Sequence, residues 1–167
     1  TILWTASTDA QSGGVEYYVE QSRSSTFATL EDVSGWVSST STLFTKLDDG
    51  VTYYHRVKAR NAVGLESGWS STVSSTQDAS APSNPVIAPE PAYSAGTSNS
   101  VFWGASSDAG VAGVQYLAER SSSSTFSTID ATVGWTAATS ASFASLTDGN
   151  TYYYRVKARD SFGRESS

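Results

Sequence analysis

Hydrophobic and polar residues alternate along several short stretches of this chain. In "TYYHRVKAR", residues 52–60, one side of an extended chain would carry Tyr53, His55, Val57 and Ala59, and the other would carry Tyr54, Arg56, Lys58 and Arg60. A period of two residues predicts a half-buried strand. No stretch of the sequence shows the hydrophobic period of a helix. Short strands separated by turns rich in Gly, Asp and Ser predict an all-β fold, an antiparallel sandwich.

The chain contains an internal duplication. Residues 2–68 align without a gap with residues 101–167, at an offset of 99 residues, and about half of the aligned positions are identical. A duplication of this length predicts two copies of one module. The identities fall at candidate core and turn positions, including the aromatic pairs Trp4 and Trp103, Tyr17 and Tyr116, Phe27 and Phe126, and Trp36 and Trp135.

All four prolines lie between residues 82 and 91, in "SAPSNPVIAPEPAY". Proline has no backbone N–H to donate, so it favours linkers, strand starts and sheet edges. We therefore place a boundary near residue 80, with one domain at 1–79, a second at 80–167, and an edge strand just after the boundary.

Counting strands on the repeat predicts that neither domain is complete within this chain. Thr1 aligns with the start of a second strand, so the first domain lacks its first strand, and Ser167 comes just before the last strand of the second domain. Residues 69–76 would form the last strand of the first domain, and residues 84–90 the first strand of the second. We expect a window from a longer tandem array. If the chain ends here, its open edges should recruit strands from neighbours.

Three stretches resemble fibronectin type III modules, especially those of bacterial extracellular enzymes and surface proteins: "LWTASTDAQSGGVEYYVE", "LDDGVTYYHRVKARNAVG" and "DASAPSNP". The resemblance implies two tandem fibronectin type III-like, or immunoglobulin-like, antiparallel β-sandwiches. It also implies a tyrosine corner in each, in which a Tyr hydroxyl bonds to upstream backbone. The corner residues would be Leu47, Gly50 and Tyr53, and Leu146, Gly149 and Tyr152. His55 departs from the family pattern, which has an aromatic residue there, as Tyr154 is in the second copy.

The composition of the chain argues against some classes of partner. The net charge of −6 is spread thinly, and no run of Lys or Arg could neutralise a nucleic acid backbone. No apolar run approaches the length of a membrane helix, so no membrane insertion is expected in this segment. The chain has no Cys and no Met and is rich in Ser and Thr. These features favour an extracellular location, secreted or at the cell surface.

Several residues were considered as catalytic or metal sites. His55 is the only histidine, and it alternates with core residues, which favours a packed structural role over a triad or metal site. Asp9 and Asp108 each offer a single carboxylate in their loop, whereas calcium takes six to eight oxygen ligands, so a turn-stabilising role is simpler. We expect no metal and no cofactor.

Acidic residues on the predicted strand that carries Glu16 and Glu20, and others nearby in sequence, raise the possibility of glycoside hydrolysis. That chemistry needs two carboxyl groups facing each other across a cleft. Glu16 corresponds to Gln115 in the second copy, and small sandwiches have convex faces. The sequence therefore predicts a protein that is not an enzyme. The acidic residues in question are Glu16, Glu20, Glu31, Asp32, Asp48 and Asp49.

A row of cations accompanies aromatic residues on the polar strand face. Arg56, Lys58 and Arg60 are matched by Arg155, Lys157 and Arg159 in the second copy. Cations stack favourably on Trp and Tyr rings. We expect Trp69 to lie within about 6 Å of at least one cation of the first row. The alternative is an exposed strip that stacks on sugar rings, formed by Tyr18, Trp36, Tyr54 and Trp69, with Trp135 in the second copy.

The sequence thus favours a non-catalytic structural module, a spacer or assembly unit of a secreted or cell-surface protein. Its partners would be neighbouring domains of a longer chain or like subunits. The alternative function is a carbohydrate-binding or adhesive module whose exposed aromatics contact polysaccharide. Fold alone does not decide between them.

Overall fold

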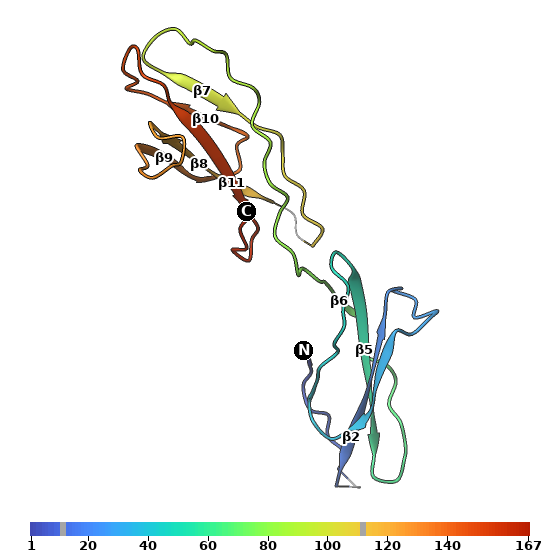
Figure 1. Cartoon of the computed structure of the whole chain (residues 1–167). Helices are drawn as coiled ribbons and strands as arrows, with labels where there is room; N and C mark the ends of the chain where they lie inside the picture. The colour runs from blue at the N-terminus through green and yellow to red at the C-terminus, as the bar shows by residue number, and fades with distance from the viewer. Residues whose placement is uncertain (11–12, 111–112) are drawn as a thin grey trace. The chain divides into compact units, whose positions relative to one another are not determined.

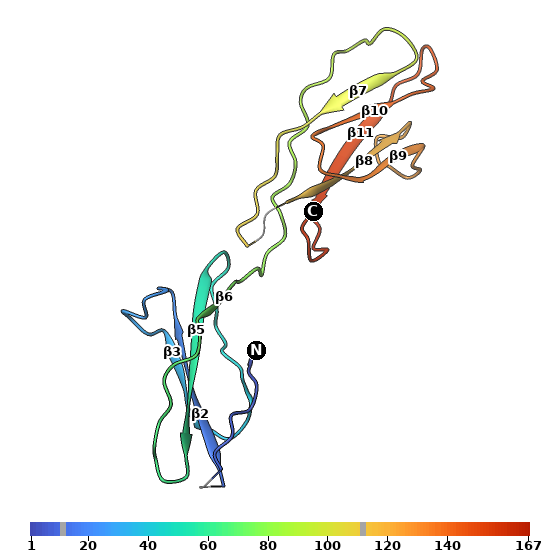
Figure 2. The same ribbon diagram turned by 180° about the vertical axis from the view of Figure 1, so that it is seen from behind.

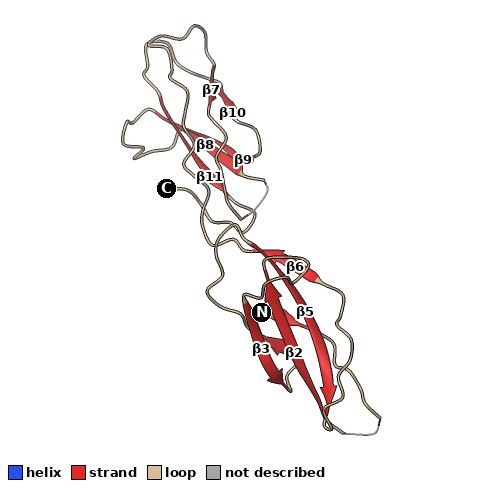
Figure 3. Ribbon diagram, turned by 90° about the vertical axis from the view of Figure 1, so that its right-hand side faces the viewer, coloured by secondary structure: helices blue, strands red, loops and turns tan. Residues whose placement is uncertain are grey.

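The computed structural model describes residues 1–10, 13–110 and 113–167, and these residues form eleven β-strands and no helix (Figure 3). They accordingly include no helix with the length and apolar character needed to cross a membrane. The chain divides into two compact units, Thr1–Ala79 and Ser80–Ser167. This boundary coincides with the proline-rich segment that suggested it. We call them unit 1 and unit 2 and describe each by itself.

Unit 1 contains two antiparallel sheets (Figure 1). The larger has the strand order β3-β2-β5-β6, and the smaller pairs β1 with β4. Figure 2 shows β3, β2 and β5 running beside one another. The strands are β1 (Ile2–Leu3), β2 (Val15–Ser22), β3 (Asp32–Val37), β4 (Ser41–Thr42), β5 (Thr52–Asn61) and β6 (Val73–Thr76).

Unit 2 repeats this arrangement with β11-β8-β9 in one sheet and β10 paired with β7 in the other. An isolated bridge joins Ile87 to Trp103 beside β7. The predicted fold class, all-β with two immunoglobulin-like antiparallel sandwiches, is confirmed. The strands are β7 (Asn99–Phe102), β8 (Gln115–Ser121), β9 (Ala131–Thr136), β10 (Ser140–Phe143) and β11 (Tyr153–Arg159).

The duplication extends to the pairing register. Tyr17 of β2 lies opposite Ala59 of β5, and Tyr116 of β8 lies opposite Ala158 of β11. All of these positions are related by the offset of 99 residues. Because a shift of one residue would turn every side chain to the other face, equal registers mean that both units turn the same alternate positions toward the core.

The core of each unit lies between its two sheets. The alternation and the repeat together predict burial of Trp4, Val57 and Ala59 in the first copy and of Val156, the equivalent of Val57, in the second. These four side chains are only half-buried, which corrects that prediction, whereas most of the other candidate core side chains are buried. In unit 1 the buried core residues include Tyr17, Val19, Phe44 and Tyr53. In unit 2 they are Val101, Trp103, Tyr116, Ala118, Ala141, Phe143 and Ala158.

An open groove explains the half-burial in unit 1. Trp4 and Val57 line this groove together with Ile2 and Val73. In unit 2 the side chain of Ile87 packs against the corresponding part of the core. A covering segment is thus present in unit 2, and within residues 1–10 and 13–79 the structure places no equivalent.

Two of the predicted strands are shorter than expected. The segment at 84–90 forms one bridge, at Ile87, although Ala88 N also donates to Phe102 O (2.8 Å). Pro85 and Pro89 flank this bridge and cannot donate to a ladder, which limits its length. The strand expected at 69–76 begins only at Val73, so Trp69 lies in the loop before it.

Candidate functional site

The alternation of β5 turns Arg56, Lys58 and Arg60 away from the core. The neighbouring strands bring rings to the same face, because Tyr18 of β2 lies opposite both Lys58 of β5 and Trp36 of β3. Cations and rings thus interleave across three strands. We call this set the cation–aromatic ladder of unit 1; it comprises Arg56, Lys58 and Arg60 with Phe27, Tyr18, Trp36 and Trp69.

Each cation of the ladder lies over at least one ring. The guanidinium carbon of Arg56 is 4.3 Å from the centroid of Trp69, and that of Arg60 is 4.3 Å from the centroid of Trp36. Lys58 Nζ is 5.0 Å from the centroid of Trp69. All three distances fall within the roughly 6 Å at which cation–π attraction is appreciable. The prediction that Trp69 lies over the cation row is confirmed.

A carboxylate completes each rung of the ladder. Glu20 accepts from Arg56 at 2.7 Å. Glu16 accepts from Arg60 through Nε at 2.8 Å and Nη2 at 2.7 Å. Glu66 accepts from Lys58 at 2.6 Å. Each cation is therefore held between a ring and an anion.

Unit 2 contains a shorter ladder, made of Arg155, Lys157 and Arg159 with two rings. Arg159 lies 4.2 Å from the centroid of Trp135, and Lys157 lies 5.5 Å from the same ring. Arg155 lies 4.6 Å from the centroid of Phe126. Among the described residues of unit 2, no ring takes the place that Trp69 has in unit 1.

Phe27 and Phe126 also belong to the ladders, although the alternation of the strands did not indicate it. Arg56 lies 4.2 Å from the centroid of Phe27, as Arg155 lies over Phe126 in unit 2. Both phenylalanines adopt left-handed backbone conformations, with φ of 54° and 53°. That conformation is unfavourable for a bulky residue. The signal that could have identified them was their identity at the 99-residue offset.

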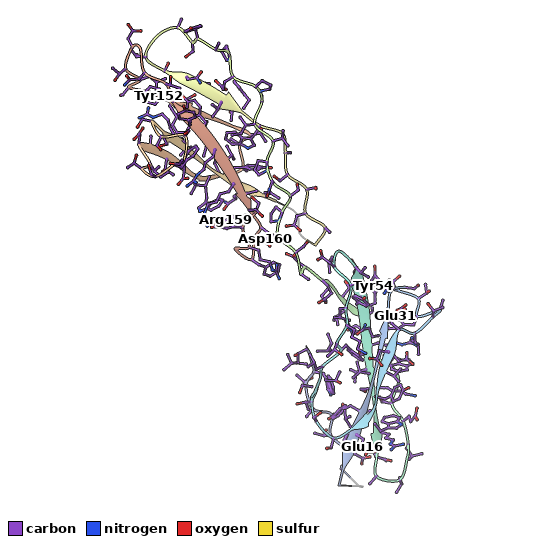
Figure 4. All side chains as sticks on the ribbon, viewed as in Figure 1. Glu16, Glu31, Tyr54, Tyr152, Arg159 and Asp160 are labelled. Atoms are coloured by element: carbon purple, nitrogen blue, oxygen red, sulfur yellow. The ribbon has the colours of Figure 1, made fainter. Side chains whose placement is uncertain are left out.

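Tyr54 was also proposed for the stacking or ligand surface, but the structure does not bring it into the ladder. In the described part of the chain it joins no ring stack and no cation–π pair. Its strand neighbours in register are Ser22 of β2 and Ser74 of β6. Figure 4 shows Tyr54 at the end of the unit where Glu31 also lies, opposite the end that carries Glu16.

Both predicted tyrosine corners have the expected hydrogen bond. Asp48 N donates to the Tyr53 hydroxyl at 3.0 Å, and Thr147 N donates to the Tyr152 hydroxyl at 3.1 Å. The backbone donation from Thr147 lowers the pKa of Tyr152. The corner glycines, Gly50 and Gly149, have φ of 72° and 76° and so adopt the left-handed conformation that glycine tolerates. The remaining corner residues are Leu47 and Leu146.

His55 is packed inside unit 1. Its residue exposure is 2%, and its ring stacks on Phe44. Burial lowers its pKa, because the charged imidazolium is poorly solvated there. A catalytic triad would need this histidine beside a solvent-accessible nucleophile, and its place in the core does not provide that.

The strand carboxylates do not form a catalytic pair. Glu16 and Glu20 each bind an arginine of the ladder, and Asp48 binds Arg23 at 2.5 Å. Figure 4 places Glu16 and Glu31 toward opposite ends of the unit. Glycoside hydrolysis requires two carboxyl groups directed at one bond, and this arrangement directs them at cations.

The two turn aspartates differ in their partners. Asp9 accepts from Asn61 Nδ2 at 2.8 Å. In unit 2 the residue equivalent to Asn61 is Asp160, and one of its carboxylate oxygens lies within 4.8 Å of a carboxylate oxygen of Asp108. Asp108 also accepts from Gly110 N at 3.3 Å, the turn-stabilising bond expected for it. Burial opposes ionisation of Asp160, but donation from Arg164 and Phe162 keeps its pKa below the ordinary value.

Comparison with known proteins gives a structural likeness but no sequence family. No protein-family model matches the sequence, and no curated protein matches it. Among solved structures, the FN1–FN3 domains of chicken CNTN1 align with 18% identity and a TM-score of 0.38, over 92% of this chain and 53% of that chain. This chain therefore spans about half of that structure. The strand order and register in each unit identify the fold as all-β, in two antiparallel sandwiches.

Proposed function

We propose that the chain is a non-catalytic structural module, a spacer or assembly unit of a secreted or cell-surface protein. One observation carries this proposal: Arg60 covers a face of Trp36, and Arg159 covers a face of Trp135. A ring that stacks on a sugar needs a free face. The rings of the two ladders are instead used within their own unit, where they join neighbouring strands.

The ladder supports a mechanical role. Its side chains connect β3, β2 and β5 across one sheet face, in addition to the backbone hydrogen bonds. Cation–π contacts contribute about 0.5–1 kcal/mol each at exposed sites. Several such contacts in parallel resist sliding of one strand past the next. Neighbouring domains of a longer chain, or like subunits, are the partners that suit a module of this kind.

The partners of the candidate catalytic residues support a non-catalytic role. The single histidine is packed against Phe44, and the strand carboxylates are bound by cations. A reactive site normally combines an accessible nucleophile or acid with a group that activates it. A Ser- and Thr-rich surface without cysteine suits an extracellular location.

A glycan array tests the proposal against the carbohydrate-binding alternative. We expect no saturable binding of the intact chain to polysaccharides. Binding that disappears in both Trp36→Ala and Trp135→Ala would establish the alternative and overturn the structural proposal. A Tyr93→Ala variant is the control, because Tyr93 is 94% exposed and lies outside the ladder.

A further inference from the structure

The larger sheets of the two units end at equivalent strands. The strand order ends at β3 in unit 1 and at β9 in unit 2, and the repeat relates these two strands to each other. In unit 2, β8 separates this edge from β11, so segments that pair with β11 do not reach it. Within residues 1–10, 13–110 and 113–167, no strand pairs with the outer side of β3 or β9. Such an edge presents backbone groups that can pair with another strand.

The edge strand of unit 1 carries two features that discourage pairing. Asp32, the first residue of β3, is exposed and places a carboxylate on the strand. Gly35 has a φ of 65°, a left-handed conformation, beside the register shift between Tyr18 and Glu20 of β2. Charged residues and bulges are common protections of edge strands, because both oppose a regular ladder with a neighbour. β3 is therefore a poor template for another strand.

The edge strand of unit 2 lacks the charge. Ala131 takes the place of Asp32, and residues 131–136, "ATVGWT", contain no ionisable side chain. The carboxylate of Asp130 precedes the strand and accepts from Ser122 N at 2.6 Å, so it is used in a turn at the end of β8. Thr, Val and Trp also favour extended backbone. Within β9, no side-chain charge opposes the approach of a second strand.

The backbone of β9 is also more regular than that of β3. Gly134 takes the place of Gly35, but its φ lies outside the left-handed region. A register shift between Tyr116 and Ala118 is present here too, yet residues 131–133 pair with consecutive residues of β8. The same edge of one fold is thus protected in unit 1 and unprotected in unit 2.

We propose that β9 is a self-association edge, at which the β9 strands of two copies of this chain pair antiparallel about a twofold axis. A twofold axis places the same strand on both sides of the contact, so a neutral strand meets a neutral strand. Main-chain hydrogen bonds between the two strands supply the affinity. The larger sheets of the two copies would then form one continuous sheet.

The charge of the chain favours this occupant. The net charge is −6, so two copies repel each other unless the surfaces in contact are uncharged. Residues 131–136 provide such a surface, and they carry no charge that would select a foreign segment of opposite sign. This proposal rests on the assembly role proposed above and names like subunits as the partner. Its failure would leave a monomeric spacer, whereas glycan binding would overturn the structural role itself.

Sedimentation equilibrium of the intact chain tests the proposal. Between about 10 μM and about 1 mM, a range suited to a small interface, the mean mass should rise from 17.6 kDa toward twice that value. Thr132→Lys adds a charge at an exposed position of the edge and should weaken dimerisation by about 3- to 30-fold. Ala131→Asp, which copies the residue of unit 1, should weaken it as well. Hydrogen exchange should show concentration-dependent protection within residues 131–136.

Val33→Lys is the matched control, because Val33 has the place of Thr132 on the edge of unit 1. It should leave the dimerisation constant unchanged. Exchange of the β8 amides in dilute, monomeric samples shows that unit 2 of each variant remains folded. The proposal is overturned if the chain stays monomeric at about 1 mM, or if Val33→Lys weakens dimerisation as much as Thr132→Lys. Protection of residues 131–136 in the monomer would also overturn it, because the edge would then be covered within the chain.

Discussion

The imidazole of His55 stacks on the ring of Phe44, with centroids 5.6 Å apart and planes inclined by 28°. At the equivalent place in unit 2, Tyr154 contacts Phe143 with centroids 5.3 Å apart. One internal repeat thus packs an imidazole, whose charged form burial disfavours, where the other packs a phenol ring. The chain therefore contains its own comparison for the effect of charge in this part of the core.

The first prediction concerns pH. Burial lowers the pKa of His55 in folded unit 1 from its ordinary value of 6.5, so the unfolded state binds the proton more tightly. The corresponding stability is fully present above pH 6.5 and is lost as the pH falls below 6.5 through the lower folded pKa. Denaturant melts of the wild type and His55→Tyr between pH 7.5 and 5 should show a decline that the variant lacks. Equal slopes in the two proteins would refute a buried neutral histidine.

The second prediction concerns the tyrosine corners. Tyr53→Phe removes the acceptor for Asp48 N and should destabilise unit 1 by about 1–3 kcal/mol, the cost of leaving a part-buried donor beside the buried Tyr53 ring without a partner. Tyr152→Phe should cost less, because Tyr152 is only half-buried and water can replace its hydroxyl. Hydrogen exchange of β2 and β8 amides reports each unit separately. A larger effect in unit 2 than in unit 1 would contradict this ranking.

A third prediction compares two tryptophans at the same place in the repeat. Trp103 is 5% exposed and belongs to the core cluster, so Trp103→Ala should destabilise unit 2 by about 3–5 kcal/mol. Trp4 lines the open groove and is half-buried, so Trp4→Ala should destabilise unit 1 by less. Hydrogen exchange of the β2 and β8 amides measures the loss of stability in each unit. Equal losses would mean that the groove of unit 1 is covered in solution.

A fourth prediction isolates the segment that covers the core of unit 2. Ile87 packs against this core, and truncation to alanine should destabilise unit 2 by about 1–3 kcal/mol, within the range for losing part of a buried aliphatic side chain. Its neighbour Val86 is 75% exposed, so Val86→Ala is the matched control and should change stability by less than about 0.5 kcal/mol. The unfolding free energy of unit 2 measures both. If the two variants behave alike, Ile87 does not contribute to the core.

Much of this structure follows from local sequence patterns. The alternation around Tyr53 predicted which side of β5 faces the core, and the 99-residue repeat predicted two copies of one module, which have equal registers in the structure. The prediction that Trp69 lies over the cation row required only the alternation of β5 together with the 99-residue repeat. These features depend on neighbours in one strand or in adjacent strands, where a period of two residues determines the direction of each side chain.

Other features depend on segments that are distant in sequence. Trp4 was expected to be buried because Trp103 has the same place in the repeat, but the coverage of each ring depends on a separate segment. The left-handed backbone of Phe27 was not anticipated, because no local rule favours that conformation in phenylalanine. The carboxylate partners of the ladder come from β2 and from the loop after β5, and spacing alone did not assign them.

The equal registers of the two units have a consequence for folding. In a refolding chain, β2 meets two strands of nearly the same sequence, β5 and β11, and it can pair with either in the same alignment. Adjacent repeats of similar sequence are prone to exchange strands in this way and to form long-lived misassembled species. Within the strands, His55 of β5 distinguishes the correct partner, because β11 has Tyr154 there. The other distinguishing residues lie outside these strands, in the loop that carries Trp69 and in the proline-rich segment. These differences between otherwise similar repeats therefore act against strand exchange as well as shaping the surface.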